Sequence, residues 1–265
     1  MLDPISQWLL SGAGRNGPIT LMYHSVRPGR GTADWTWAVS QQRFDEQMEL
    51  LQQDGWRTCT VSELAGPGPL PDKSVAITFD DGYQDNFQAF MSLAKRGMCG
   101  TVFMVSRDVG GRAGWQGEGG SGMLMLDKTQ LRELLVAGME VGCHSRSHPR
   151  LTEVGDARLC DEVSGARDEL QDQIGAGVSS FAYPYGDYDA RVVDAVRRAG
   201  FSAACVTRSG CGRVEDDPLR LRRIAIFAED DLASFARKLA FADNEAGWLR
   251  VGAYYLGRVR ARFSV

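Results

Sequence analysis

Two aspartates and two histidines are the residues of this chain whose types and spacing point most directly to chemistry. Asp80 and Asp81 are adjacent, and two of the chain's three histidines, His144 and His148, lie four residues apart. Adjacent carboxylates repel, so a divalent cation bound by one would stabilise both charges and leave the other ionised as a base. An i, i+4 histidine pair places two imidazoles on one face of a helical turn, a spacing that a Zn²⁺-type ion accepts. Each pair also has an ordinary explanation, namely an Asp-Gly turn that caps a helix, and two core or surface histidines.

The elements that must position these residues follow from the apolar pattern, in which short apolar runs alternate with amphipathic helical stretches. This alternation predicts an α/β fold, a distorted (β/α) barrel with about seven parallel strands, plus a C-terminal helical extension. The expected strands are 19–24, 75–79, 100–105, 139–143, 180–183, 202–206 and 221–226. The expected helices are 42–53, 83–96, 128–137, 157–174 and 189–199.

Both polar pairs directly follow an expected strand. In α/β barrels the functional groups gather at the C-terminal ends of the strands, so the two pairs should meet there. Asp81, His144 and His148 would then supply three protein ligands and leave a coordination position for water, as in catalytic and not structural zinc sites. The sequence therefore predicts a divalent metal, with Zn²⁺ the first choice and Co²⁺ or Ni²⁺ compatible with the same ligands.

Two further segments are candidates for contacting a substrate. The turn from Tyr183 to Gly186 ends the expected strand 180–183. Its Tyr185 N–H could face an oxyanion, and Tyr183 or Tyr185 could form a substrate-contacting wall. The glycine-rich segment 109–122 contains Trp115 and is expected to be a mobile loop beside the site.

Composition limits the classes of function and the compartment. A net charge of -4 gives no reason to expect nucleic acid as a partner. The first ten residues resemble no secretory signal, and no apolar stretch reaches the roughly 18 residues of a membrane span. Six scattered cysteines without a C-x-x-C pair fit buried, reduced thiols. These features predict a cytoplasmic protein.

The C-terminal part is expected to differ from the rest of the chain. Residues 1–228 should form the barrel and residues 229–265 a helical extension packed on or beside it. The stretch 232–263 mixes aromatic residues with Arg250, Arg258, Arg260 and Arg262. Such a basic amphipathic helix either closes the barrel and solvates its charged face, or makes a weak contact with an anionic membrane surface.

Three motifs together resemble the polysaccharide deacetylase (NodB-like) family. They are Thr78-Phe-Asp-Asp-Gly82, His144-Ser-Arg-Ser-His148 and the Tyr-Pro-Tyr-Gly turn, in the family's order. The resemblance covers roughly residues 19–227 and implies hydrolysis of acetamido groups on sugars. By motif position it implies that Asp80 is the general base, that Asp81 and the two histidines are the metal ligands, and that the Tyr185 amide holds the oxyanion.

The chain departs from the family pattern at two places. The third motif usually opens with an arginine that orients the catalytic aspartate, but Ala182 occupies that position, and Arg223 is the candidate to replace it. The family usually supplies a late histidine as general acid, yet none follows His148, and the only one left is His24. The opening Tyr23-His24 resembles the biofilm poly-N-acetylglucosamine deacetylases, whose motifs are circularly permuted. We therefore expect His24 to protonate the leaving amine; a core histidine on the first strand is the alternative.

The reaction expected is release of acetate from an N-acetylated sugar or glycan, with a lipid-linked precursor among the possible substrates. Three other functions remain open at this point. A glycoside hydrolase is disfavoured because adjacent Asp80 and Asp81 cannot flank a sugar at about 5–10 Å. A metal-dependent amidase acting on a non-sugar would use the same residues, and a non-catalytic sugar-binding barrel would tolerate the departures at Ala182 and after His148.

Overall fold

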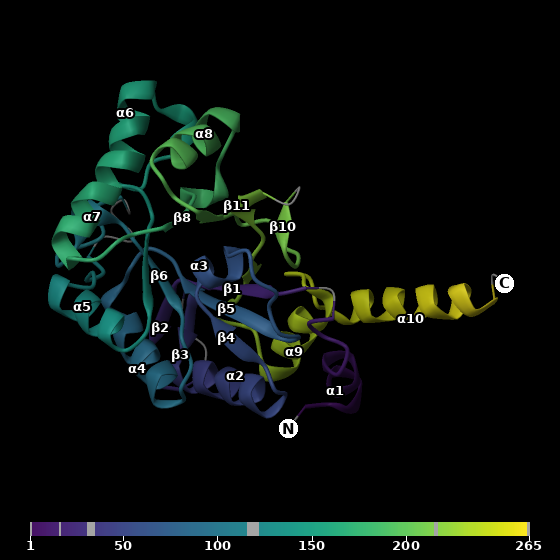
Figure 1. Ribbon diagram of the computed structural model, residues 1–265. Helices are drawn as coiled ribbons and strands as arrows, with labels where there is room; N and C mark the ends of the chain where they lie inside the picture. Colours follow the sequence, from purple (N-terminus) through teal and green to yellow (C-terminus); the bar gives the residue numbers. More distant parts are fainter. Residues whose placement is uncertain (1, 16, 31–34, 116–121, 215–216, 264–265) are drawn as a thin grey trace.

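A curled, mostly parallel sheet organises the molecule (Figure 1). The computed structural model describes residues 2–15, 17–30, 35–115, 122–214 and 217–263, and the side chains of these residues except 213, 214 and 257–263. The strands of the sheet are β1 (Ile19–Tyr23), β4 (Arg57–Cys59), β5 (Ser74–Phe79), β6 (Thr101–Met104), β7 (Glu140–Cys143), β8 (Ser180–Ala182), β9 (Ala203–Cys205), β10 (Arg213–Val214), β11 (Asp217–Leu221) and β12 (Ile224–Ala225). Two short strands, β2 (Ser25–Arg27) and β3 (Ala38–Ser40), pair separately.

The strand order makes the sheet a distorted barrel. It runs β10-β11-β9-β8-β7-β6-β5-β1-β12, with β4 paired to β5, and among the described strands of this sheet only the β10–β11 pair is antiparallel. β11 and β12 are separated only by Arg222 and Arg223, yet β11 pairs with β9 and β12 pairs with β1. One bent segment therefore bridges the two ends of the sheet, which confirms the predicted fold class. The expected continuous strand 221–226 was wrong, because the chain bends at these arginines to change its pairing partner.

Helices cover the outside of the sheet. They are α2 (Gln41–Gln53), α3 (Val61–Ala65), α4 (Phe87–Lys95), α5 (Lys128–Val136), α6 (Asp156–Cys160), α7 (Ala166–Ile174) and α8 (Ala190–Arg198). Helix α2 shows why the sequence pattern predicted a helix here. Its N-cap Ser40 accepts a hydrogen bond from the Arg43 N–H, and its apolar face of Phe44, Met48 and Leu51 is buried.

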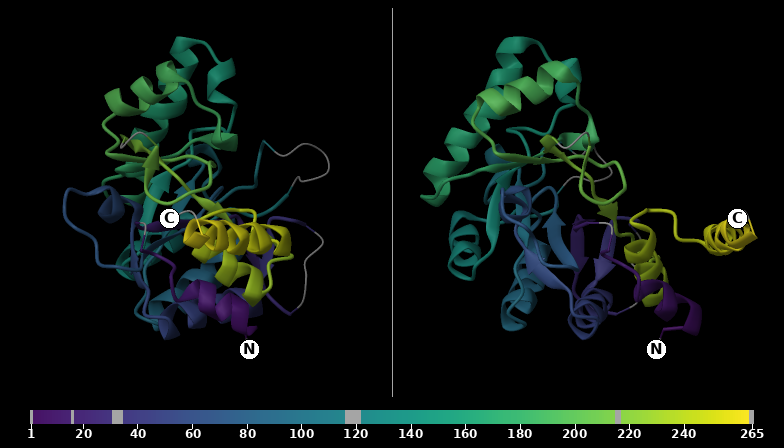
Figure 2. Two further views of the ribbon diagram at one scale, coloured as in Figure 1. Left: turned by 90° about the vertical axis from the view of Figure 1, so that its right-hand side faces the viewer. Right: turned by 45° about the vertical axis from the view of Figure 1, so that its right-hand side comes forward.

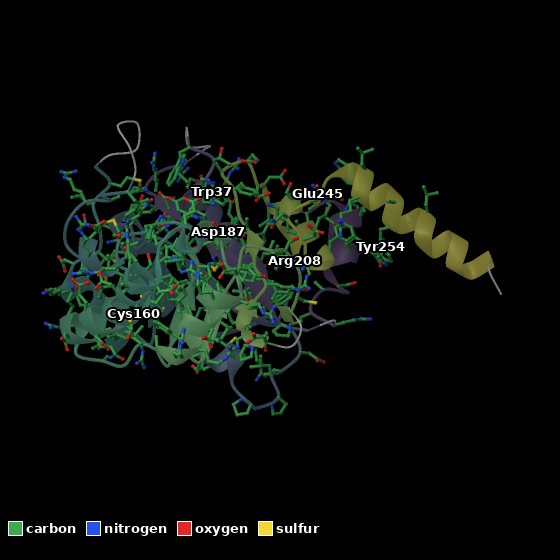
Figure 3. All side chains as sticks on the ribbon, turned by 90° about the horizontal axis from the view of Figure 1, so that it is seen from above. Trp37, Cys160, Asp187, Arg208, Glu245 and Tyr254 are labelled. Atoms are coloured by element: carbon green, nitrogen blue, oxygen red, sulfur yellow. The ribbon has the colours of Figure 1, made fainter. Side chains whose placement is uncertain are left out.

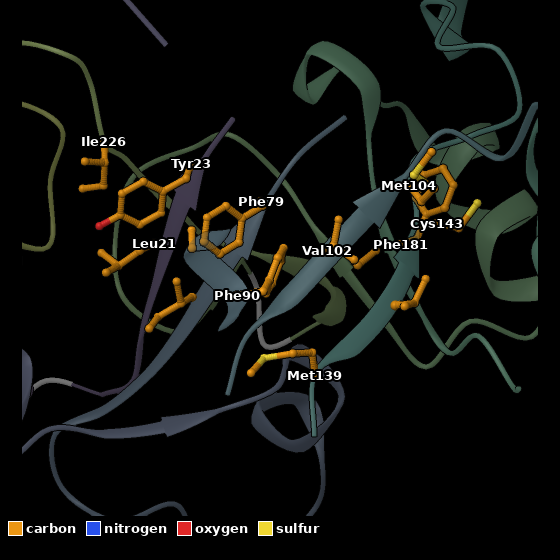
Figure 4. Packing of buried hydrophobic residues seen from close by; sticks show 14 of the residues in the cluster. Leu21, Tyr23, Phe79, Phe90, Val102, Met104, Met139, Cys143, Phe181 and Ile226 are labelled. Carbon is orange, nitrogen blue, oxygen red and sulfur yellow. The ribbon is translucent and has the colours of Figure 1, made fainter. Parts of the chain in front are cut away.

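Aromatic side chains fill the space between the strands and helices (Figure 4). Phe79 on β5 lies 5.4 Å from Tyr23 on β1 and 4.4 Å from Phe90 on α4, measured between ring centroids. All three rings are fully buried. This packing fixes the end of β5, the strand that carries the Asp80-Asp81 pair, because a core phenylalanine contributes about 3–5 kcal/mol of stability.

Two predicted helices are interrupted. The expected helix 157–174 consists of α6, a π-helical segment Asp161–Gly165 and α7. The expected stretch 232–263 consists of α9 (Leu232–Phe241) and α10 (Trp248–Phe263), because Ala242 adopts a left-handed conformation with φ of 50° and ends α9. Helix α1 (Pro4–Leu10), which the sequence did not predict, packs against α9. Among the residues that the structure describes, no helix is long and apolar enough to cross a membrane.

Candidate active site

A cavity of about 590 Å³ lies at the C-terminal ends of the strands and contains the predicted chemistry. Trp37, one of its lining residues, is labelled in Figure 3. The lining residues come from almost every strand-to-helix connection of the barrel: Met22, His24, Trp35, Trp37, Asp80, Asp81, Trp115, His144, His148, Arg150, Tyr183, Tyr185, Thr207, Ala225, Phe227 and Asn244. The strands therefore bring together residues that are far apart in the sequence.

Asp81, His144 and His148 form a candidate metal centre inside this cavity. The Asp81 Oδ1 atom lies 3.6 Å from His144 Nε2 and 3.3 Å from His148 Nε2. All three side chains are buried, and one ligand atom from each lies within 4.8 Å of the others. Two imidazole nitrogens and one carboxylate oxygen that converge in this way suit a divalent cation with an open position.

The protonation of His144 and of Asp81 also fits a metal. The His144 Nδ1 lies 2.7 Å from the Ala182 carbonyl oxygen, so Nδ1–H donates and Nε2 keeps its lone pair. Burial lowers the pKa of His144 to about 4, which keeps the imidazole neutral. Although burial acts to raise the pKa of Asp81, the nearby histidines hold it below its usual range. A metal needs neutral imidazoles and an ionised carboxylate, and His144 and Asp81 meet these requirements.

The loop that carries the two histidines is not the helical turn that the i, i+4 spacing predicts. Ser145 and His148 adopt left-handed backbone conformations, with φ of 64° and 59°. The His148 N–H donates to the Ser145 Oγ at 3.0 Å. The prediction was wrong about the local structure because β7 ends at Cys143 and the chain turns sharply to bring the second imidazole back over the first.

A buried carboxylate that the sequence did not single out holds this loop. Glu162 accepts hydrogen bonds from the Arg146 N–H at 3.1 Å, the Ser147 N–H at 2.8 Å and the Ser147 hydroxyl at 2.5 Å. It lies in the π-helical segment Asp161–Gly165, a kind of irregularity that is frequent at functional sites. A glutamate within an amphipathic helical pattern carries no local signal of such a role.

Asp80 is paired with Arg223, the arginine predicted to orient it. The guanidinium binds the carboxylate with both Nη atoms, at 2.5 Å to Oδ1 and 2.8 Å to Oδ2. Arg223 is fully buried, and it also donates to the Val206 carbonyl at 3.1 Å and the Thr78 hydroxyl at 3.2 Å. Although burial acts to raise it, the pKa of Asp80 is held below its usual value, chiefly by this guanidinium.

His24 lies in the same cavity, just beyond the end of β1. Its ring lies 4.3 Å from that of Trp37, and its Nδ1 has no hydrogen-bond partner among the described residues. The buried Asn86 holds the backbone on both sides of it, since its amide donates to the His24 carbonyl at 2.7 Å and its Oδ1 accepts the Val26 N–H at 2.8 Å. Burial lowers the pKa of His24, and the nearby Asp81 and Asp80 oppose that shift.

The predicted substrate-contacting residues differ in how far their side chains are exposed. Tyr185 is half exposed and its ring lies 4.6 Å from His148. Trp115 stacks on His148 with ring centroids 4.8 Å apart, although residues 116–121 of its glycine-rich segment lie outside the described residues. Tyr183 is fully buried and donates its hydroxyl to the Leu219 carbonyl at 3.0 Å. Tyr185 and Trp115 can therefore offer surface to a ligand, whereas Tyr183 packs inside the barrel wall.

Aromatic residues that the sequence did not single out complete the cavity. Trp35 and Phe227 line it together with Trp37, and the Trp37 and Phe227 rings lie 4.9 Å apart. Aromatic faces beside a few polar groups are usual for sites that bind organic ligands. No pattern in the sequence separates these rings from core aromatics, because they reach the cavity only through folding.

A metal centre with an adjacent ion-paired carboxylate, on a distorted (β/α) barrel, defines a metal-dependent hydrolase. The family model described as polysaccharide deacetylase matches residues 68–204, slightly more than half of the chain. The chain belongs to the polysaccharide deacetylase family. The predicted activity is thereby confirmed: the protein is a hydrolase that removes N-acetyl groups from an N-acetylated glycan and releases acetate.

Three relatives illustrate the likeness. YxkH from Bacillus subtilis is 26% identical over 229 residues, which cover 84% of this chain and 76% of YxkH. The structure of IcaB from Ammonifex degensii is similar with a TM-score of 0.72 and 28% identity, over 85% of this chain and 97% of that chain. The poly-beta-1,6-N-acetyl-D-glucosamine N-deacetylase of Escherichia coli is 30% identical over 73 residues, which are 26% of this chain and 11% of that enzyme.

Proposed function

We propose that this deacetylase belongs to the subgroup in which an N-terminal histidine serves as the general acid, and that His24 has this role. The observation that carries the proposal is the position of His24 in the cavity that also holds Asp80 and the metal centre. The likeness to IcaB and the partial match to the poly-beta-1,6-N-acetyl-D-glucosamine N-deacetylase support it. A poly- or oligo-N-acetylglucosamine is accordingly the first substrate to test.

Each side chain has one task in the proposed reaction. Asp81, His144 and His148 would hold a divalent cation, which supplies a Lewis acid for the acetyl carbonyl and lowers the pKa of the attacking water. Asp80 accepts the proton that this water loses, and Arg223 keeps Asp80 ionised and oriented for that step. The proposed donor to the oxyanion is the Tyr185 N–H. His24 gives a proton to the departing sugar nitrogen as the C–N bond breaks and acetate forms.

We propose zinc as the metal, because two imidazoles and one carboxylate are a usual zinc ligand set; cobalt and nickel are compatible with it. The aromatic walls formed by Trp115, Tyr185 and Trp37 support binding of a pyranose ring, whose C–H faces pack on aromatic rings. We further propose a cytoplasmic site of action. Cys143 and Cys205 support this, because both are fully buried free thiols.

Acetate release tests the proposal directly. The purified protein is incubated with N-acetylglucosamine oligomers, a lipid-linked N-acetylated glycan and a non-sugar acetamide, before and after removal of the metal with a chelator. We expect release from at least one glycan, its loss on chelation, and its recovery on adding zinc, cobalt or nickel. Acetate release that survives complete removal of the metal would contradict the mechanism, and release from the non-sugar acetamide alone would favour the amidase alternative.

A further inference from the structure

Helix α10 extends away from the barrel. Figure 1 and the right-hand view of Figure 2 both show it leaving the rest of the chain near α9 and α1. Of its described side chains only Val251 is buried, whereas Trp248, Leu249 and Leu256 are 56%, 93% and 63% exposed. A helix that closed the barrel would bury its apolar side chains, so α10 does not serve that purpose.

The first turns of α10 are nevertheless firmly attached to the body. Tyr255 stacks on Trp8 of α1 with ring centroids 5.4 Å apart, and Tyr254 packs on Phe241 of α9 at 5.6 Å. Arg250 forms an ion pair of 2.9 Å with Asp243. The contacts hold one side of the helix, so its opposite side faces outward in a defined direction.

Helix α1, which contacts α10 through Trp8, also exposes apolar side chains. Ile5 and Trp8 are 39% and 43% exposed. We call the apolar residues that the two helices expose together the α1–α10 surface, which consists of Ile5, Trp8, Trp248, Leu249, Tyr254, Tyr255 and Leu256. Large exposed apolar side chains gathered on neighbouring elements mark a site of interaction more often than single ones do.

The order of residues along α10 has the period of an interfacial helix. Leu249, Gly252, Ala253 and Leu256 recur three or four positions apart and are all exposed, so the outward side of α10 carries no charged residue over these turns. Apolar stripes of this kind bury to a shallow depth at the boundary between lipid headgroups and acyl chains, in the plane of the membrane. Tryptophan and tyrosine are enriched at that depth.

The charge of the segment indicates which membrane it suits. Residues 248–265 contain no Asp or Glu, although the whole chain has a net charge of -4. The segment contains four basic residues, Arg250, Arg258, Arg260 and Arg262. A purely basic segment on an otherwise acidic protein complements an anionic lipid surface, while the acidic remainder is repelled from it.

We propose that the α1–α10 surface binds the surface of an anionic lipid bilayer, with α10 lying in the plane of the membrane. The binding requires no metal and no substrate, so it is independent of the catalytic proposal. If the substrate is a lipid-linked glycan, which rests on the proposed function, this surface would hold the active site close to it.

Co-sedimentation of the full-length protein with vesicles tests this proposal. Vesicles of phosphatidylcholine mixed with phosphatidylglycerol should bind the protein, and vesicles of phosphatidylcholine alone should bind it about tenfold more weakly or not at all. Leu256→Glu, and separately the double variant Arg260→Glu with Arg262→Glu, should each weaken binding to the anionic vesicles by about tenfold. The matched control is Val136→Glu on α5, an apolar side chain that is 91% exposed on a different helix, and it should bind like the unaltered protein.

The possible outcomes separate the membrane from other occupants of the surface. Absence of binding to the anionic vesicles, or equal losses in the control and in Leu256→Glu, would overturn the proposal. So would a dimer in light scattering that Leu256→Glu converts to a monomer while no vesicles are bound, because a second copy would then be the partner. Acetate release from a soluble oligomer should be the same in Leu256→Glu, which distinguishes a failed membrane proposal from a failed catalytic one.

Discussion

Asp80 and His24 line the same cavity, but the protein surrounds them with different kinds of partner. Both oxygens of Asp80 are bound by the guanidinium of Arg223, a fully buried residue whose other hydrogen bonds go to the barrel wall. The His24 Nδ1 has no partner among the described residues, and the ring faces the indole of Trp37. The negative charge of Asp80, the proposed base, is therefore balanced by a bound guanidinium. The ring of His24, the proposed acid, has no such partner among the described residues.

This difference fits the tasks proposed for the two residues. A base must be ionised at rest, and a buried carboxylate stays ionised only beside a compensating charge. A general acid must change its protonation during the reaction, and a fixed ion pair would prevent that. The protein fixes the position of His24 through the backbone instead, since Asn86 binds the His24 carbonyl and the Val26 N–H. The comparison teaches that position and charge are controlled separately in this site.

The largest effect is expected for Asp80→Asn. The amide cannot accept a proton from water, so acetate release should fall about 10³–10⁴-fold, at the upper end of general base catalysis. The metal should still bind, because Asp81, His144 and His148 are unchanged. Isothermal calorimetry of metal binding and acetate kinetics measure the two properties on one sample. The variant leaves Arg223 without its counter-charge, so thermal unfolding serves as the control for folding; full acetate release by a folded variant would remove Asp80 from the mechanism.

A smaller loss, about 10²–10³-fold, is expected for His24→Ala on an N-acetylated sugar, because the departing amine loses its proton donor. An aryl acetate expels a phenolate, which needs no such donor, so His24→Ala should hydrolyse it at nearly the rate of the unaltered enzyme. Asp80→Asn should lose activity on both substrates, because both need an activated water. Equal losses of His24→Ala on the two substrates would show that His24 acts by packing or positioning and not as an acid.

Much of the barrel was predictable because its signals are local. Parallel strands covered on both faces read as continuous apolar runs, and six of the seven expected strands correspond to single strands of the sheet. The prediction of the seventh strand, 221–226, was wrong, because the pairing changes from one end of the sheet to the other at Arg222 and Arg223. The pattern of apolar residues does not report which neighbour a strand chooses.

The parts of the site that depend on long-range contacts were less predictable. The spacing of His144 and His148 alone indicated that they are candidate metal ligands. The same spacing suits both a helix and the left-handed turn that the structure has. Glu162 and Asn86 reach the site through hydrogen bonds to residues 15 to 62 positions away, and neither has an unusual sequence context. Arg223 was inferred only because Ala182 left a role unfilled. The metal ligands, Asp80 and His24 were therefore visible in the sequence, whereas Glu162 and Asn86, which hold the backbone around them, were not.

On the metal side, the contribution of Glu162 can be isolated with Glu162→Gln. The amide keeps the size of the side chain but can no longer accept three hydrogen bonds with a full negative charge. We expect about tenfold weaker metal binding, the lower end of what partners of metal ligands contribute, measured by competition with a chromogenic chelator. Asp161→Asn is the matched control, because Asp161 lies on the same segment but binds only the exposed end of Arg146. Unchanged metal affinity in Glu162→Gln would mean that the histidine loop keeps its shape unaided.

The smallest effect is expected for Asp85, which binds Ser25, the residue that follows His24. Its carboxyl accepts the Ser25 hydroxyl at 2.6 Å, its Oδ1 has no partner among the described residues, and burial raises its pKa to about 6. The folded state therefore binds this proton more tightly than the unfolded state. The resulting stability is present below pH 3.8 and is lost as the pH rises through about 6.

Asp85→Asn removes this pH dependence and retains an acceptor for Ser25. Between pH 5 and pH 8 the variant should gain about 1 kcal/mol of unfolding free energy relative to the unaltered protein, measured by urea unfolding at both values. The control Asp172→Asn, which removes an exposed carboxyl from α7, should show no such gain. A difference that is the same at pH 5 and pH 8 would mean that Asp85 is ionised throughout. The negative charge of Asp85 would then be balanced by its surroundings. The contrast between the surroundings of Asp80 and those of His24 would no longer hold.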